Sequence, residues 1–299
     1  QVLIKQGKAI LEDVPAPVVA ENEILVHVHY SCISTGTEIS GLKTASVPLY
    51  KRVFKEPHNV KKVLDMLKDK GVSGTVARVK SKLDTGYPTG YSASGIVLET
   101  GDKITDIKPG DRVACAGAGI ANHAEFIAVP RNLMVKVPDA LSLQVASTIT
   151  LGSIALQGIR RAKPELGNFI AVIGLGILGQ LSTQLLKANG VRVIGIDIDE
   201  KRITTALSLG MDRGLNSSKD NIVNEVIRFS NGYGVDSVFI TASSDSNDII
   251  NQSMEMCRRK GKVVIIGAVG LNLKRDEFYK KELDVLISTS YGPGRYDDK

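Results

Sequence analysis

The sequence predicts an α/β protein in which a β-rich N-terminal part is followed by a doubly wound parallel sheet. Short apolar runs separated by Gly and Pro turns fill much of the first third of the 299 residues. A strand–helix–strand pattern then occupies Phe169–Asp199, and helices and strands continue to alternate after it. Such alternation is typical of parallel sheets that are covered by helices.

The first third of the chain is expected to form a small barrel. Alternating apolar residues predict a strand at Ile24–Val28, and further strands are expected at Ile96–Leu98 and Ala124–Val129. We place this domain at residues 1–140. Within it, residues 41–86 are predicted to form a basic helical insert with eleven Lys/Arg and four Asp/Glu. The insert is either a solvated helical face or a means of attracting an acidic substrate.

The remaining elements define a second domain at residues 141–299. A bridging helical stretch begins near Ser142, which is expected to act as its N-cap. Apolar periodicity then predicts elements on either side of the central pattern. Helices are expected at Lys201–Leu209, Asn221–Phe229 and Asp248–Arg258, and strands at Asp236–Ile240, Lys262–Ile266 and Val285–Ser288.

The central pattern has the features of a dinucleotide site. A buried strand, Phe169–Ile173, leads into Gly174, Gly176 and Gly179 at G-x-G-x-x-G spacing. These glycines allow, in turn, a sharp turn, the approach of a pyrophosphate to bare backbone, and close packing of helix on strand. The helix that follows offers unpaired N–H groups to the anion, which makes Ile177 and Leu178 candidate contacts as well.

Asp197 points to the kind of dinucleotide. It stands 23 residues after Gly174, where a carboxylate can accept hydrogen bonds from the adenosine ribose. NAD is therefore favoured over NADP, whose ribose phosphate a carboxylate would repel. The main alternative is S-adenosylmethionine, whose sites also use a Gly-rich turn and an acid after the second strand. The uninterrupted strand–helix–strand pattern with its third glycine favours the nicotinamide coenzyme.

Composition excludes several other classes of protein. No apolar run reaches the roughly 18 residues of a membrane helix, and the N-terminus lacks the apolar core of a signal peptide. Cys32, Cys115 and Cys257 are odd in number and far apart, which fits a reducing cytoplasm. Only Tyr50 and Phe54 lie among the charges of the basic insert, so a nucleic-acid partner is not expected.

The order of further motifs resembles the medium-chain dehydrogenase/reductase superfamily. Beside the glycine turn, the matching stretches are GTE at Gly36–Glu38, GDRV at Gly110–Val113, AEF-x-x-VP at Ala124–Pro130, GVDSVFITASS at Gly234–Ser244 and GKVVIIGAVG at Gly261–Gly270. This resemblance spans nearly the whole chain. It implies a GroES-like catalytic domain, a Rossmann domain with the active site in the cleft between them, and nicotinamide-dependent oxidation or reduction at an alcohol or carbonyl carbon. It also implies a small-molecule substrate and, in many members, a homodimer.

The zinc ligands of the superfamily's alcohol dehydrogenases are not matched. Those enzymes carry Cys-Gly-Thr-Asp where this chain has Thr35–Glu38, and Gly-His-Glu where it has Gly90–Ser92. Their third ligand falls near Thr150–Gly152, and their four-cysteine lobe is missing here. Because zinc needs soft or anionic ligands, we expect a zinc-free member with no metal site.

Without zinc, the resemblance assigns the polar chemistry to other side chains. Thr37 inherits a hydrogen bond to the substrate oxygen, and Tyr91 takes the place of a zinc-binding His. Tyr91 either donates a hydrogen bond or proton or fills the vacated cavity, and Glu38 orients Tyr91 or Thr37. The same resemblance adds candidate coenzyme contacts at Lys201, Arg202, Thr241, Ala242, Ser243, Gly267 and Ala268.

Within the superfamily, the S-T-G-T-E and G-Y-S-A-S-G stretches look most like a zinc-lacking bacterial branch. That branch includes two-part proteins in which such a chain is fused to a Gfo/Idh/MocA-type oxidoreductase. The superfamily's C-terminal return segment is not evident before Lys299, so a fused second oxidoreductase domain is an expectation. The substrate expected for this branch is an acidic or nucleotide-linked sugar. The alternatives are a non-catalytic coenzyme-binding domain with a regulatory or structural role, and a quinone or enone reductase.

Overall fold

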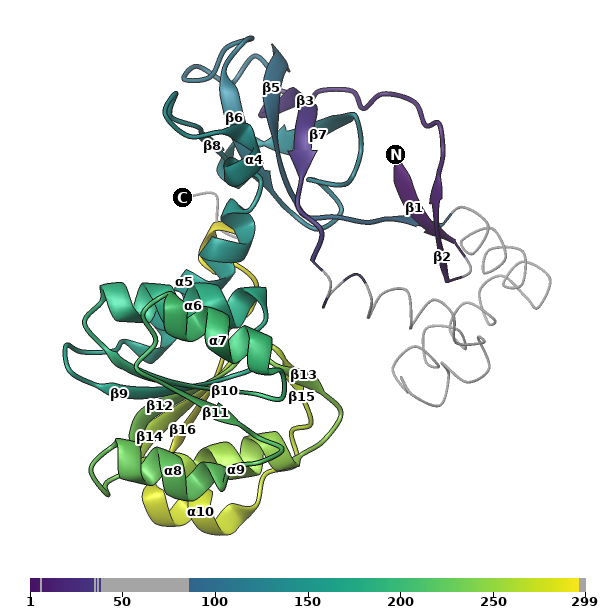
Figure 1. Cartoon of the computed structure of the whole chain (residues 1–299). Helices are drawn as coiled ribbons and strands as arrows, with labels where there is room; N and C mark the ends of the chain where they lie inside the picture. The colour runs from purple at the N-terminus through teal and green to yellow at the C-terminus, as the bar shows by residue number, and fades with distance from the viewer. Residues whose placement is uncertain (6, 35, 37, 39–85, 296–299) are drawn as a thin grey trace. The chain divides into compact units, whose positions relative to one another are not determined.

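The computed structural model describes residues 1–295 except residues 6, 35, 37 and 39–85. The chain forms two compact units, Gln1–Ile149 and Thr150–Lys299, which are drawn in Figure 1. The basic insert predicted at residues 41–86 lies outside the described residues except for its last position. No helix among the described residues is both long and apolar enough to cross a membrane.

The N-terminal unit is built from antiparallel sheets. The larger has the strand order β7-β3-β5-β6-β8, and the smaller has the order β2-β1-β4. Ile24 and Val26 lie two residues apart on β3, on the same face of the strand, and both are fully buried. The bounds are β1 Val2–Lys5, β2 Lys8–Leu11, β3 Glu23–Ser31, β4 Tyr87–Pro88, β5 Ser92–Thr100, β6 Arg112–Ala116, β7 Phe126–Pro130, the 3-10 helix η1 Arg131–Leu133, β8 Met134–Lys136 and α4 Leu143–Ala146.

The C-terminal unit is a parallel sheet covered by helices on both faces. Its strand order is β11-β10-β9-β12-β14-β16, and Figure 1 shows α5, α6 and α7 on one face and α8, α9 and α10 on the other. The bounds are α5 Ile149–Ala162, β9 Phe169–Ile173, α6 Ile177–Ala188, β10 Arg192–Asp197, α7 Glu200–Ser208, β11 Arg213–Asn216, α8 Ile222–Phe229, β12 Val235–Ile240, β13 Ser243–Ser244, α9 Asp248–Met256, β14 Cys257–Ile265, β15 Ala268–Val269, α10 Arg275–Lys281, β16 Asp284–Ile287 and the 3-10 helix η2 Pro293–Arg295.

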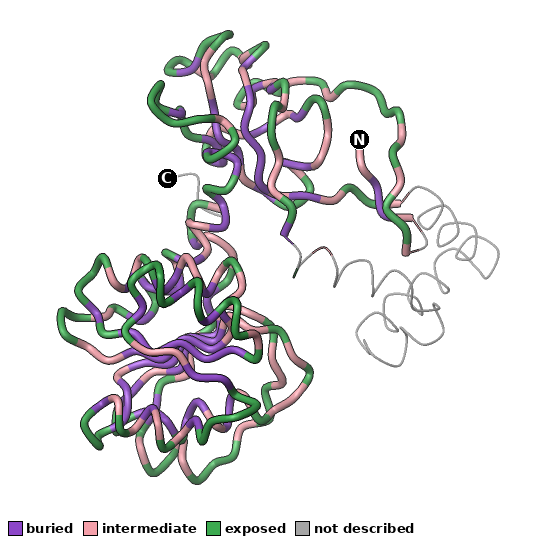
Figure 2. Tube along the Cα trace, viewed as in Figure 1, coloured by how far each residue is buried: buried purple, intermediate pink, exposed green. Residues whose placement is uncertain are grey.

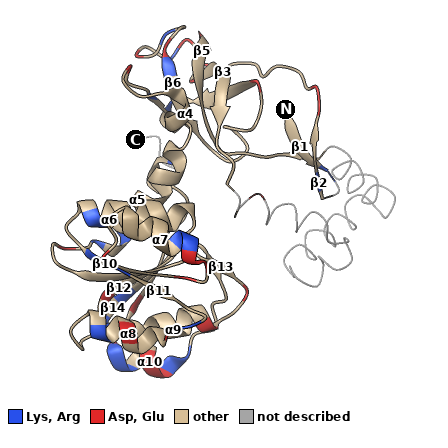
Figure 3. Ribbon diagram, in the orientation of Figure 1, with Lys and Arg blue, Asp and Glu red and all other residues tan. Residues whose placement is uncertain are grey.

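Alternation along the strands builds a separate core on each face of this sheet. On β9, Ile170 and Val172 pack with residues of α5, α6 and α7, whereas Ala171 and Ile173 pack with residues of α8 and α9. The sheet is accordingly the most deeply buried part of the unit (Figure 2), and the unit's charged residues lie mainly on its helices and loops (Figure 3). The predicted α/β fold is therefore confirmed.

The sheet also has a point at which its winding direction reverses. The chain runs from β9 to β10 and β11 on one side, and then returns to place β12 on the other side of β9. In open parallel sheets, ligands bind beyond the carboxyl ends of the strands at such a reversal. The turn after Ile173 and the loop after Ile240 both leave the sheet there.

Two sequence-based boundaries were wrong. The helix predicted to reach Arg258 ends at Met256, and the strand predicted from Lys262 begins at Cys257. The reason is that Cys257 is extended and pairs with Val235 before the register shifts. Similarly, the strand expected at Ile96–Leu98 is longer, because β5 already begins at Ser92. The Ser92 hydroxyl is buried and donates to the Ser147 carbonyl at 2.6 Å, so a polar stretch can form a core strand.

Candidate functional site

The glycine turn has the geometry that its spacing predicts. Gly174 has φ +90°, and a Cβ atom there would lie 2.7 Å from the Ala242 nitrogen. A Cβ atom on Gly179 would lie 1.9 Å from the Gly174 carbonyl oxygen, so helix α6 packs directly on the turn. By contrast, nothing lies within 4 Å of a Cβ position on Gly176. The middle glycine is therefore the one that faces open space.

Helix α6 begins at this open position without a side-chain cap. Gly176 is its N-cap and makes no side-chain hydrogen bond, and its first turn carries no acidic residue. The first N–H groups of a helix have no partner within the helix and carry a partial positive charge. Ile177 and Leu178, which open α6, therefore present backbone donors suited to an anion.

Asp197 ties this turn to the end of β10. Its side chain accepts hydrogen bonds from the Leu175 amide at 2.6 Å and from the Asp199 amide at 2.9 Å. The residue is only 7% exposed. Arg202 lies beside it, with a guanidinium nitrogen 3.7 Å from the Asp197 carboxylate and another 3.7 Å from Asp199. Lys201 is exposed in the first turn of α7.

The loops after β12 and β14 bring the other predicted coenzyme contacts together. The Thr241 hydroxyl donates to the Ile173 carbonyl at 3.0 Å, and Gly267 lies so close to Ala242 that a Cβ atom would meet the Ala242 carbonyl oxygen at 2.1 Å. Just beyond, Ser243–Ser244 pairs in parallel with Ala268–Val269. The predicted residues of both loops thus form one continuous edge beside the glycine turn.

These two loops are fastened by a buried amide. Asn251 of α9 donates from Nδ2 to the carbonyls of Asn247 and Asn272, at 2.8 and 3.1 Å, and accepts at Oδ1 from the Lys274 amide at 2.8 Å. Asn247 in turn accepts from the Asn272 amide at 2.9 Å. The loop after β14 is therefore held to the start of α9 by side-chain hydrogen bonds that the sequence pattern does not indicate.

In the N-terminal unit, Glu38 belongs to a hydrogen-bonded cluster. Its Oε1 accepts from the Ser34 amide at 2.8 Å. Both carboxylate oxygens approach Nε2 of His123, at 3.2 and 3.3 Å. On the other side of the ring, Nδ1 of His123 lies 2.8 Å from the Ser31 hydroxyl oxygen. The side chains of His123 and Glu38 are 9% and 14% exposed, so the pair is largely withdrawn from water.

Tyr91 follows Gly90, which packs against His123 of the same cluster. Gly90 has φ +97°, and a Cβ atom there would lie 2.7 Å from the His123 nitrogen and 3.0 Å from its ring. The His123 amide also donates to the Thr89 carbonyl at 2.8 Å. The segment that carries Tyr91 and the segment that carries Glu38 therefore meet at His123, and Tyr91 itself is half-buried. Thr37 lies outside the described residues.

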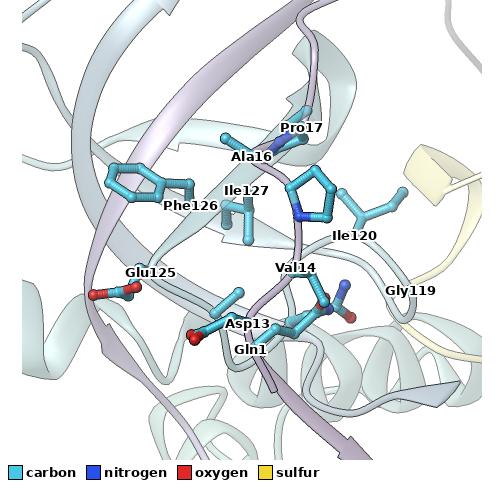
Figure 4. A pocket seen from close by; sticks show the side chains of 14 residues that line it. Gln1, Asp13, Val14, Ala16, Pro17, Gly119, Ile120, Glu125, Phe126 and Ile127 are labelled. Carbon is cyan, nitrogen blue, oxygen red and sulfur yellow. The ribbon is translucent and has the colours of Figure 1, made fainter. Parts of the chain in front are cut away.

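A cavity of about 370 Å³ lies on the other side of the His123 segment. Asn122 and Ala124 line it, whereas the ring of His123 between them meets Ser31 and Glu38. Figure 4 shows the side chains around this cavity, which come from residues 13–17 and 119–128 with Gln1. None of the site residues expected from the sequence lines it.

The described residues do not fit a catalytic zinc ion. Zinc is held by thiolate, imidazole and carboxylate ligands. Where the third zinc ligand would fall, Thr150 and Leu151 are buried, and a half-buried tyrosine stands in place of the second. In the part of the chain that the structure covers, no group of three or more His, Cys, Asp and Glu side chains could hold a metal.

Sequence reasoning missed His123 and Ser31. His123 lies in the stretch GIANHAE, and it is one of four histidines in the chain. Its contacts with Glu38 and Ser31 join residues 85 and 92 positions apart. The available signal was its rarity, together with its place just before the strand predicted at Ala124–Val129.

Comparison with known proteins relates this geometry to oxidoreductases. Residues 178–298 match the sequence model of the family described as zinc-binding dehydrogenase. Similar solved structures include 2R,3R-butanediol dehydrogenase from Bacillus subtilis, at 19% identity and a TM-score of 0.74 over 98% of this chain and 85% of that one. Galactitol-1-phosphate dehydrogenase from Escherichia coli has 18% identity and a TM-score of 0.75 over 97% and 82%.

Reductases share the same fold. Escherichia coli quinone oxidoreductase, solved in complex with NADPH, is 20% identical with a TM-score of 0.72 over 94% of this chain and 77% of that one. The chain thus has the fold that these dehydrogenases and reductases share, a Rossmann-like parallel sheet joined to a GroES-like antiparallel one, and its residues 178–298 carry the sequence pattern of the zinc-binding dehydrogenase family.

Proposed function

We propose that the chain is an oxidoreductase of the medium-chain dehydrogenase/reductase superfamily that transfers a hydride between NAD(H) and an alcohol or carbonyl group. The observation that carries this proposal is the open Gly176 in front of the uncapped helix α6, with Asp197 at the end of the neighbouring strand. A nicotinamide dinucleotide matches this arrangement, because it combines an anionic pyrophosphate with a ribose that can donate hydrogen bonds.

Each part of this site has a separate role toward the coenzyme. The backbone N–H groups at the start of α6 bind the pyrophosphate, and Asp197 accepts from the adenosine ribose. The loops at residues 241–243 and 267–268 support the nicotinamide end. The bound coenzyme supplies hydride transfer, and the protein supplies its position and the surrounding electrostatics. Asp197 favours NAD, although Arg202 is a cation near enough to contact a ribose phosphate.

We propose further that the enzyme works without zinc. Tyr91 and Thr37 then hydrogen-bond the substrate oxygen, which draws electron density from the carbonyl carbon. The substrate class that we favour is an acidic or nucleotide-linked sugar. The excess of seven positive charges between Gly41 and Gly86, from eleven Lys/Arg and four Asp/Glu, supports an anionic substrate.

Coenzyme binding and turnover measured together test this function. Calorimetry should detect NADH binding that is tighter than NADPH binding. Oxidation of NADH should follow with at least one member of a panel of keto sugars that includes uronic acids and nucleotide-linked sugars, and prior dialysis against a chelator should leave the rate unchanged. Binding without turnover on any substrate would instead support a non-catalytic coenzyme-binding domain, and an absence of binding would refute the coenzyme site.

Tyr91→Phe tests the role of the phenol. Removing the hydroxyl should lower kcat at least ~tenfold, as expected for loss of a group that assists proton transfer. The affinity for NADH should not change, because the coenzyme is assigned to residues of the other unit. Unchanged turnover in this variant would mean that Tyr91 only fills space.

A further inference from the structure

In the cluster at His123, the partners determine which groups donate and which accept hydrogen bonds. An ionised carboxylate only accepts hydrogen bonds, so the contact with Glu38 requires a proton on Nε2 of His123. In the neutral ring, Nδ1 is then an acceptor, and the Ser31 hydroxyl, 2.8 Å away, donates to it. The oxygen of Ser31 keeps lone pairs with which it can accept another hydrogen bond. The hydrogen-bonded groups therefore run from the Ser31 hydroxyl, through the imidazole ring of His123, to the Glu38 carboxylate.

The ring is held in this orientation from several sides. The His123 carbonyl accepts from the Val2 amide at 2.8 Å, and its amide donates to Thr89 at 2.8 Å. Gly90 supplies the room for the ring, since a Cβ atom there would lie 3.0 Å from it. Glu38 is fixed in turn by the Ser34 amide. A preorganised group of this kind loses little freedom when a proton moves.

We propose that Ser31, His123 and Glu38 form a proton relay that takes the hydroxyl proton of the substrate during oxidation and returns it during reduction. This inference rests on the proposed function. When the alcohol is oxidised, its O–H bond breaks and the proton passes to the Ser31 oxygen, while the Ser31 proton passes to Nδ1 of His123. A bound nicotinamide coenzyme would accept the C–H electron pair as hydride, and the carbonyl double bond would form. The imidazolium that results stands beside the Glu38 carboxylate.

Burial makes this carboxylate effective. An opposite charge within a few ångströms stabilises an imidazolium more strongly in a water-poor site than at the surface, and the Glu38 and His123 side chains are largely buried. Among the described residues, Cys32 is a further titratable neighbour of Glu38. Burial, and secondarily the charge of Glu38, raises the pKa of the Cys32 thiol. That thiol therefore stays protonated and does not compete for the proton.

A purely structural role is the alternative explanation of the cluster. The same hydrogen bonds join Ser34 and Glu38 to the segment before β7, and that segment to the end of β3. Loss of any member would then weaken folding without changing how the rate depends on pH. The two roles therefore differ in kinetics, not in the contacts.

Substitutions that keep the shape but not the proton chemistry separate these roles. His123→Gln retains an amide donor and acceptor but cannot carry a proton, and Ser31→Ala removes only the terminal hydroxyl. His27→Gln is the matched control, because His27 is an exposed histidine on β3, the strand that ends at Ser31. For each variant, kcat is measured against pH with the most active substrate, NADH affinity by calorimetry, and the urea midpoint by circular dichroism.

The relay predicts a specific combination of results. His123→Gln and Ser31→Ala should lower kcat at least ~100-fold, leave NADH affinity unchanged, and lack the inflection in kcat against pH that the relay predicts for wild type. The control should match wild type in all respects. Imidazole added to His123→Ala should restore part of the rate, in proportion to the concentration of its free base.

Two outcomes overturn the relay, and one of them separates it from the proposed function. If wild type is active and His123→Gln or Ser31→Ala keeps both its rate and its pH inflection, the relay is wrong while the proposed function stands. If wild type binds NADH but turns over no substrate, both are wrong. Should the His123 variants fail to fold, Ser31→Ala still decides the matter, because it leaves the contact between His123 and Glu38 in place.

Discussion

Gly176→Ala tests the coenzyme site without disturbing the fold. Gly176 has φ −68° and ψ −169°, a conformation open to any L-residue, and a Cβ atom would meet nothing within 4 Å. We therefore expect the free energy of unfolding to stay within about 0.5 kcal/mol of wild type, as for most surface substitutions. The new methyl group would occupy the space that we propose for the pyrophosphate. The dissociation constant for NADH should rise at least ~tenfold, or about 1.4 kcal/mol.

Gly179→Ala is the matched comparison within the same turn. Its Cβ atom would lie 1.9 Å from the Gly174 carbonyl oxygen and 3.0 Å from the Thr241 hydroxyl. Because the first of these atoms is backbone, helix and turn must move apart, and overpacking of this kind costs about 1–3 kcal/mol. This variant should lose both stability and coenzyme affinity.

Calorimetry with NADH and urea unfolding followed by far-UV circular dichroism measure the two quantities separately. Gly176→Ala should change only the first and Gly179→Ala both. If Gly176→Ala bound NADH as tightly as wild type, the pyrophosphate would not lie over Gly176, and the reasoning from open space to coenzyme contact would fail.

Three further predictions concern the groups around this site and the buried thiols. Asp197→Asn should weaken NADH binding more than NADPH binding, because the amide no longer repels a ribose phosphate beside Arg202. Calorimetry with both coenzymes measures this, and an unchanged ratio of the two affinities would contradict the role. Asn251→Ala should lower the free energy of unfolding by about 1–3 kcal/mol, because it leaves backbone groups of two loops without partners. The urea midpoint should therefore fall, and an unchanged midpoint would show that water replaces the amide. Burial raises the pKa of Cys115 and of Cys257 from 9.0 to about 12. The folded state then keeps protons that the unfolded state loses. The contribution of these thiols to stability should therefore be constant below about pH 9 and fall between about pH 9 and 12, and urea midpoints that do not fall across that range would refute it.

The coenzyme half of the fold could be predicted because its signals are local. Phe169–Ile173 was predicted as a strand and is β9 with the same bounds. Glycine spacing within six residues specified the turn. Asn221 was predicted to start a helix, and it is the N-cap of α8, where its side chain accepts a hydrogen bond from the Asn224 amide. Each of these features depends on neighbours within one or two turns of chain, so composition and periodicity suffice to find them.

The polar cluster of the N-terminal unit could not be predicted in the same way. Its members lie on segments that meet only after the antiparallel sheet has formed, and the chain between Glu38 and His123 spans 85 positions. The sequence singled out Glu38 as an orienting group but assigned it to Tyr91 or Thr37. Its contact with Ser34 is local. Its contact with His123, just before β7, depends instead on the pairing of β7 with β3, which no periodicity encodes. Helix α10 marks a milder failure of another kind: the sequence did not indicate it, because none of its residues is buried.

The two hydrogen bonds that Asp197 accepts have a consequence for how coenzyme preference can change. The same carboxylate that would select the ribose also fixes the Leu175 amide in the glycine turn and the Asp199 amide at the start of α7. A substitution of Asp197 would therefore change the coenzyme preference and the local structure together. A change toward NADP would disturb the structure less if a cationic residue replaced Ile198, which is 71% exposed, while Asp197 stayed in place.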